Sequence, residues 1–184
     1  PKELKNRQML AQSCGASDIA QAVLPEGLEL LNLPGHCPDM LGISTPDGVC
    51  FIADSLSGEQ VLEKYHVTLV YDVAAHLETL TLLEGISTKL FVPSHAPATE
   101  DIRTLVAANR NKTLEIADLV LALADGGRSA EDILKGVFEQ YDIAMNINQY
   151  TLLKTTILSY LSFLIERGLV ELGFSENKAI FRRI

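Results

Sequence analysis

The chain of 184 residues is long enough to bury one substantial hydrophobic core or two smaller ones. Its composition, 47% hydrophobic and 21% charged, excludes intrinsic disorder, and no segment approaches the roughly 20 consecutive apolar residues that cross a bilayer. The net charge of −9 disfavours attraction to nucleic acid or to anionic membrane. We therefore expect a globular protein of the cytoplasm that does not bind membranes.

Residues 1–98 alternate short apolar runs with turn residues, a pattern that predicts strands. The sequence begins with a helix-like segment over residues 4–15, and a helix is expected again over residues 73–83, with Gly85 as its stop. The expected strands are GLELLNLPG (27–35), LGIS (41–44), VCFIAD (49–54), KYHVTLVYD (64–72) and STKLFVPSH (87–95). Thr45-Pro46-Asp47-Gly48 suits a tight turn between the second and third strands. Strands that alternate with a helix predict a layered α/β domain over residues 1–98.

Residues 99–184 change to helical spacing, and we expect a second, mostly helical domain there. A long helix is expected over residues 99–123, and a second begins at Ser129, where an acid three residues later completes a capping signal. A third helix, over residues 148–167, ends at Gly168 and is followed by two short strand candidates. This order of helix, helix and β-hairpin is typical of a winged-helix domain.

The charges of this second domain do not favour DNA binding. It has 10 Lys and Arg against 12 Asp and Glu, and the candidate recognition helix has only Lys154 and Arg167 as cations. We expect this domain to pack on the first half or on another subunit and not to bind nucleic acid.

Three residues at the ends of expected strands could bind a metal. His36 follows Leu33-Pro34-Gly35, His95 follows Val92-Pro93-Ser94, and Asp54 follows five apolar-looking residues. Such positions display functional side chains in α/β folds, and a carboxylate after a buried strand needs a partner. Imidazole nitrogen and carboxylate oxygen are common ligands of zinc and iron.

Each residue also has a structural interpretation. Either histidine could be a hydrogen-bonded surface residue, and Asp54 could cap a helix. His66, on a polar connection, and His76, on a helix face, are interpreted as structural or solvated. Three cysteines, an odd number without C-x-x-C spacing, predict reduced thiols and neither a disulfide framework nor a zinc knuckle. Cys37 beside His36 is interpreted as a packing or bystander residue rather than a nucleophile.

Taken together, LNLPGHCPDMLGI, VCFIADSL and TKLFVPSHAPAT resemble the latter part of the metallo-β-lactamase superfamily. The resemblance covers residues 25–98, and the tail resembles the winged-helix extension of one hydrolase subgroup. It implies part of an αββα-layered fold in which His36 binds one metal, Asp54 bridges two and His95 binds the other. It further implies a metal-bridged hydroxide that attacks an ester, thioester or related bond of a small-molecule substrate, with Asp54 as the catalytic carboxylate. Zinc is the expected metal, with two ions in the whole protein, and iron or manganese is an alternative.

The sequence also departs from the family pattern. The superfamily motif H-x-H-x-D-H is absent, Asp39 stands where the family usually has Gly, and Ala53 stands where Gly commonly precedes the bridging Asp. Asp39 would add a carboxylate near the site. We expect the C-terminal part of a longer hydrolase, inactive by itself, whose uncovered apolar surface favours self-association. The alternative is a non-catalytic scaffold whose winged-helix tail binds a protein or nucleic-acid partner.

Overall fold

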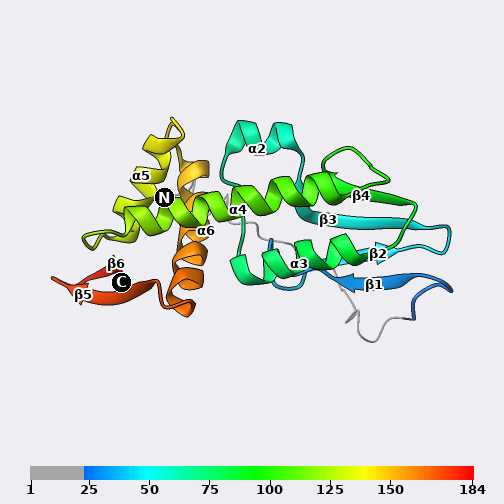
Figure 1. Cartoon of the computed structure of the whole chain (residues 1–184), viewed down its shortest axis with the longest axis horizontal. Coiled ribbons are helices and arrows are strands. Elements are labelled where there is room, and N and C mark those ends of the chain that lie inside the picture. The colour runs from blue at the N-terminus through cyan, green and yellow to red at the C-terminus, as the bar shows by residue number, and fades with distance from the viewer. Residues whose placement is uncertain (1–22) are drawn as a thin grey trace.

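The computed structural model describes residues 23–184, so the expected helix over residues 4–15 and Cys14 lie outside the described residues. A four-stranded sheet occupies one end of the molecule (Figure 1). Its strands are β1 (Glu29–Asn32), β2 (Leu41–Ser44), β3 (Val49–Ser57) and β4 (Leu90–His95), in that spatial order. The first three strands pair antiparallel, and β4 runs parallel to β3.

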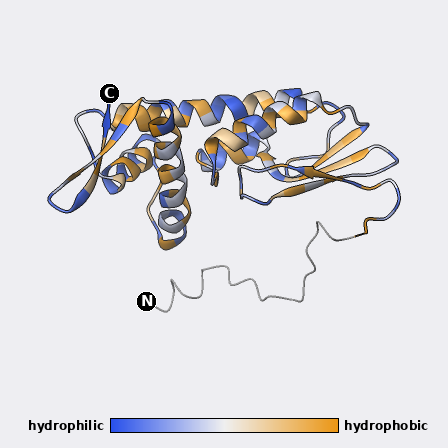
Figure 2. Ribbon diagram, turned by 90° about the horizontal axis from the view of Figure 1, so that it is seen from below, coloured by the Kyte–Doolittle hydropathy of each residue, from blue (hydrophilic) through white to orange (hydrophobic). Residues whose placement is uncertain are grey.

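Helices cover one face of this sheet (Figure 2). Helix α3 (Val73–Gly85) and the first part of α4 (Arg103–Leu123) pack on β3. Because side chains alternate along a strand, Cys50 and Ile52 enter the core while Phe51 between them is exposed. The core beneath these helices consists of Leu33, Met40, Cys50, Ile52, Leu56, Leu80, Leu83, Phe91, Ile102 and Val106.

The strand expected over residues 64–72 is wrong. Residues Glu59–Tyr65 form a short helix, α2, and residues 66–72 form a loop that pairs with no strand. Two of their apolar side chains, Val67 and Val70, are buried in the helical core. Their backbone groups bond elsewhere, since Val70 N–H donates to Thr156 Oγ1, and Tyr71 N–H donates to the Gly35 carbonyl. Apolar residues here mark burial against a helix rather than a strand of the sheet.

The remaining elements follow the order that the sequence predicts. Helices α5 (Ala130–Gln140) and α6 (Ile147–Glu166) precede a hairpin of β5 (Val170–Ser175) and β6 (Lys178–Arg183). Helix α5 begins with the expected capping box. These elements enclose a second core built mainly by α4, α5 and α6. The assignment of a separate winged-helix domain over residues 99–184 stays a prediction.

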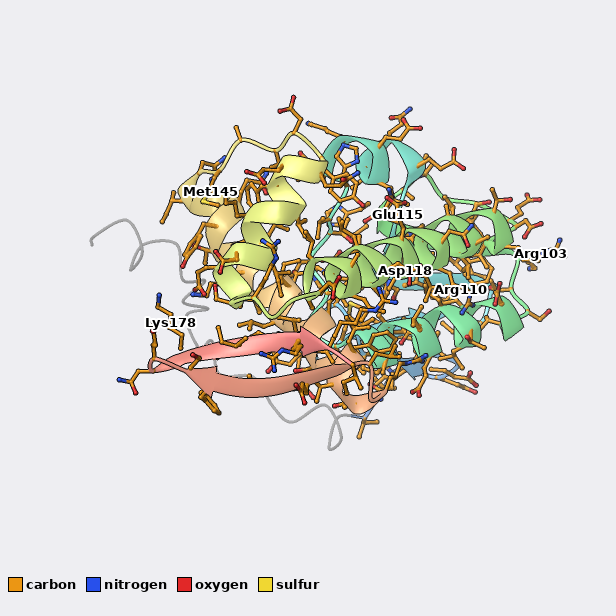
Figure 3. The ribbon with its side chains drawn as sticks, turned by 60° about the vertical axis from the view of Figure 1, so that its left-hand side comes forward. Arg103, Arg110, Glu115, Asp118, Met145 and Lys178 are labelled. Carbon is orange, nitrogen blue, oxygen red and sulfur yellow. The ribbon has the colours of Figure 1, made fainter. Side chains whose placement is uncertain are left out.

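Helix α4 extends from the sheet to the helical end of the molecule (Figure 1). Near the sheet, the Arg110 guanidinium forms an ion pair with Glu84 of α3 at 2.8 Å, and Arg110 and Arg103 project from α4 in Figure 3. Further along, Ile116, Ala117 and Val120 are buried in the helical core. One continuous helix thus contributes to both hydrophobic cores. Among residues 23–184, none of the helices combines the length and apolar composition that crossing a bilayer requires.

Candidate metal centre

The structure brings His36, Asp54 and His95 together. Asp54 Oδ2 lies 3.5 Å from His36 Nε2, and Asp54 Oδ1 lies 3.5 Å from His95 Nε2. Strands β3 and β4 are parallel, and their register pairs Ala53 with Pro93 and Ser57 with His95, so Asp54 of β3 lies near the end of β4. His36 comes from the loop after β1. Their spatial arrangement agrees with the sequence prediction, whereas their role as metal ligands stays a prediction.

The backbone of β3 is distorted at the residue before Asp54. Ala53 has a φ of 48°, in the left-handed region that glycine favours, and the pairing with β4 shifts register on both sides of it. The regular alternation of buried and exposed side chains stops here, and Ala53 and Asp54 are both half-buried. This explains in physical terms why Gly would suit position 53.

His36 is oriented by a backbone carbonyl. Its Nδ1 lies 3.0 Å from the Leu69 oxygen, which can only accept, so Nδ1–H donates and Nε2 of the neutral ring carries a lone pair. That lone pair and the Asp54 carboxylate are both acceptors that face each other. A cation between them would relieve the repulsion, and a His ligand commonly has this kind of support at its other nitrogen.

The loop that carries His36 fits closely against α3. A Cβ on Gly35, which has a φ of 133°, would lie 2.5 Å from the His76 Cα atom. The Gly35 carbonyl accepts hydrogen bonds from the backbone N–H groups of Tyr71 and Asp72. Both contacts fix the loop before His36, so only Gly suits position 35.

His76 is a site residue that the sequence interpretation missed. It is 6% exposed, lines the same cavity as Asp54 and has no hydrogen-bond partner for its Nδ1 atom among the described residues. Burial, with smaller contributions from the charges of His36 and Arg110, lowers its pKa to about 4. Its helical spacing with Val73 and Leu80 could have placed it on the buried face of α3.

A cavity of about 630 Å³ opens beside the three residues, a volume typical of small-molecule sites. It is bounded by the ends of β3 and β4, by α2 and the loop after it, and by α3, α4 and α6. The lining residues outside the cluster and His76 are Leu56, Ser57, Val61, Tyr65, Val67, Thr68, Leu69, Asn109, Asn148, Gln149, Leu152 and Leu153. The helical half of the chain therefore supplies one wall of the site.

The Asn109 side chain of α4 forms hydrogen bonds with the backbone of Ser57, the last residue of β3, three residues beyond Asp54. Its Oδ1 accepts from the Ser57 N–H at 2.9 Å, and its Nδ2 donates to the carbonyls of Ser57 and Leu105, each at 2.8 Å. Asn109 is 4% exposed, so these bonds are shielded from water. No local pattern indicates this role, because the two partners are 52 positions apart in the sequence.

Other residues weighed from the sequence are not among those that line the cavity. His66 stacks on the Tyr141 ring, with 4.7 Å between ring centroids, in agreement with a structural role. Cys37 is exposed, and burial raises the pKa of the Cys50 thiol. Asp39 is exposed and is not among the residues that line the cavity, and its contribution to the site stays a prediction.

The donor types and spacing agree with a metal site that is incomplete. Two ligands of one tetrahedral zinc ion with bonds of 2.0–2.1 Å lie roughly 3.3 Å apart, close to the 3.5 Å observed for each imidazole and Asp54. However, within residues 23–184 no group of three or more His, Cys, Asp or Glu side chains is already arranged to hold a metal ion. The cluster therefore supplies suitable donors but not a full coordination shell.

Comparison with known proteins identifies the fold. No family model and no curated protein sequence matches the chain. A metallo-β-lactamase family protein from Thermus thermophilus is 20% identical with a TM-score of 0.67, and the match covers 85% of this chain and 49% of that one. A β-lactamase domain protein from Burkholderia ambifaria is 20% identical with a TM-score of 0.71, covering 92% of this chain and 54% of that one.

These matches confirm the expected metallo-β-lactamase-like fold. The chain spans about half the length of the two solved structures. Residues 1–98 are little more than half of this chain, so a coverage of 85% or more includes helical elements beyond them. The helical part therefore has counterparts in both structures.

Proposed function

We propose that this chain is the C-terminal, metal-binding part of a hydrolase that cleaves an ester, thioester or related bond of a small molecule. The observation that carries the proposal is the Asp54 carboxylate between the Nε2 atoms of His36 and His95, at the mouth of a cavity. Similarity in fold to metallo-β-lactamase family proteins supports it.

In this proposal each residue of the cluster has a distinct part. His36 would bind metal through Nε2, because its Nδ1–H is committed to the Leu69 carbonyl. Asp54 has one oxygen toward each imidazole and could serve two ions, while His95 would bind the second. Bound zinc, or iron or manganese, would lower the pKa of a coordinated water and polarise the scissile carbonyl.

The chain by itself should be a weak catalyst. Its sequence has no H-x-H-x-D-H motif, and the cluster offers three donors, fewer than a two-metal site needs. In the whole protein, the part that corresponds to the rest of the structural relatives would supply the remaining ligands.

The absence of a ready coordination shell among the described residues favours a second candidate, a non-catalytic scaffold whose helical tail binds a partner. The two candidates differ in metal content. A scaffold needs no zinc. The hydrolase proposal requires the chain to bind zinc, and it requires this binding to depend on all three residues.

The test is zinc retention after gel filtration, measured by elemental analysis on the chain and on His36→Ala, Asp54→Ala and His95→Ala. In the chain alone, three donors suffice for one shared ion, so we expect about one zinc per chain, lost in the three variants and kept in the control His66→Ala, whose ring packs on Tyr141. A chain without zinc, or zinc that persists in all three variants, would contradict the proposal and favour the scaffold.

A further inference from the structure

The cavity beside the cluster has an apolar wall that the proposed chemistry does not explain. Val61 of α2 and Leu152 of α6 contribute to it, and Leu152 is 47% exposed although it is a large apolar side chain. The other aliphatic residues of the lining are Leu56, Val67, Leu69 and Leu153. A ligand that covered Leu152 would gain the free energy of removing this surface from water.

The side chains of the cavity disfavour one substrate class. Among residues 23–184, no Lys or Arg lines the cavity, and the polar groups that α6 contributes are the neutral amides of Asn148 and Gln149. Phosphate groups are usually bound by Arg, Lys or free backbone N–H groups. At the start of α6 the N–H groups of Asn148 and Gln149 are already bonded to the Asn146 side chain. Beyond the metal cluster at its mouth, the cavity would therefore offer a phosphodiester chain no cationic side chain among the described residues.

We infer that this cavity binds the apolar acyl chain of a neutral ester or thioester and that Leu152 of α6 determines its specificity. The inference rests on the proposed function, because the cluster at the mouth would face the carbonyl group. The helical part thus selects the substrate, because the first turns of α6 contribute Asn148, Gln149, Leu152 and Leu153 to the lining of the cavity.

The test measures binding rather than turnover. Straight-chain primary amides from acetamide to octanamide are titrated into the full chain in the presence of a metal chelator, with octyl phosphate as the anionic comparison. We expect Kd to fall about fourfold per added CH₂, equivalent to about 0.8 kcal/mol, and octanamide to bind at least tenfold more tightly than octyl phosphate. A Kd independent of chain length, or tighter binding of octyl phosphate, would overturn the inference.

A matched pair of variants tests whether the alkyl chain of octanamide binds in this cavity. Leu152→Gln should weaken octanamide binding about tenfold, whereas Leu158→Gln, at a similarly exposed leucine of α6 outside this cavity, should leave it unchanged. Melting temperatures check that both variants are folded. Equal effects of the two variants would overturn the inference. Because the metal is chelated, failure here is independent of the zinc-retention result, which tests the proposed function.

Discussion

The carboxylate of Asp54 faces two imidazole rings, and the strand that presents it is distorted one residue earlier. Local backbone geometry and a single carbonyl contact at His36 therefore do much of the positioning. The backbone conformation at Ala53 and the hydrogen bond of His36 each involve a single residue and can be tested by single substitutions.

Ala53→Gly should stabilise the chain. Ala53 has a φ of 48°, a conformation that costs an L-residue roughly 1–2 kcal/mol, and part of this gain is offset by the greater freedom of Gly in the unfolded chain. We expect the free energy of unfolding to rise by about 0.5–1 kcal/mol in urea titrations. Ala75→Gly in α3 is the control and should lower it by about 1 kcal/mol. A lower free energy of unfolding in Ala53→Gly would contradict the claim that the backbone at Ala53 is strained.

Stability should depend on pH through His76. Its pKa is about 4 in the folded chain, against an ordinary value of 6.5, and the charged groups that lower it besides burial are His36 and Arg110. Between these values the unfolded chain binds more protons, so stability falls as the pH is lowered from 6.5 towards 4, by up to about 3 kcal/mol. Chemical denaturation at several pH values measures the free energy of unfolding as a function of pH, and its slope between pH 4 and 6.5 should be smaller in His76→Gln than in the wild type. An unchanged slope would show that other groups cause it.

At the scale of elements, the site is assembled where β3, β4 and α4 meet, and Asn109 joins β3 to α4. Asn109→Leu would leave the Ser57 N–H and carbonyl without these partners. We expect a loss of about 2–4 kcal/mol in the free energy of unfolding, because buried polar groups without partners are costly. Asn111→Leu, on the exposed side of the same helix, should change it by less than about 0.5 kcal/mol. Similar effects at both positions would contradict the role of Asn109.

The sequence predicted those elements whose pattern is local. The capping signal at Ser129 and the strand end at His95 follow from neighbouring residues, and the structure agrees with them. The strand expected to end at Asp54 instead continues to Ser57, because Asn109 bonds the Ser57 backbone. The segment over residues 64–72 was misread because its burial depends on α6, more than 80 positions away at Thr156. The roles of His76 and Asn109 depend on such distant contacts too, and helical periodicity alone could not assign them to the site.

At the scale of the whole molecule, the sheet has one covered face and one that is largely exposed. The pairing register aligns Leu30, Ile43, Phe51 and Val92 in one row across all four strands on the exposed face. Ile43 is 40% and Phe51 46% exposed. A contiguous apolar patch of this kind favours association with another surface.

We expect copies of the chain to associate through this face. Analytical ultracentrifugation should detect species larger than the 20.1 kDa monomer, and Phe51→Lys should shift the distribution towards the monomer. Phe174→Lys, at an exposed aromatic residue on the distant hairpin strand β5, is the control and should leave the distribution unchanged. A monomeric wild-type chain would contradict this expectation.

The central claim is that His36, Asp54 and His95 bind a metal ion, and zinc X-ray absorption on the zinc-loaded chain tests it most directly. The account predicts a shell of nitrogen and oxygen only, at about 2.0–2.1 Å, with outer-shell scattering from two imidazole rings around the one zinc that the chain holds, and no retained zinc in His36→Ala or His95→Ala. Sulfur at about 2.3 Å, which would implicate Cys37 or another cysteine, or a shell without imidazole would contradict it.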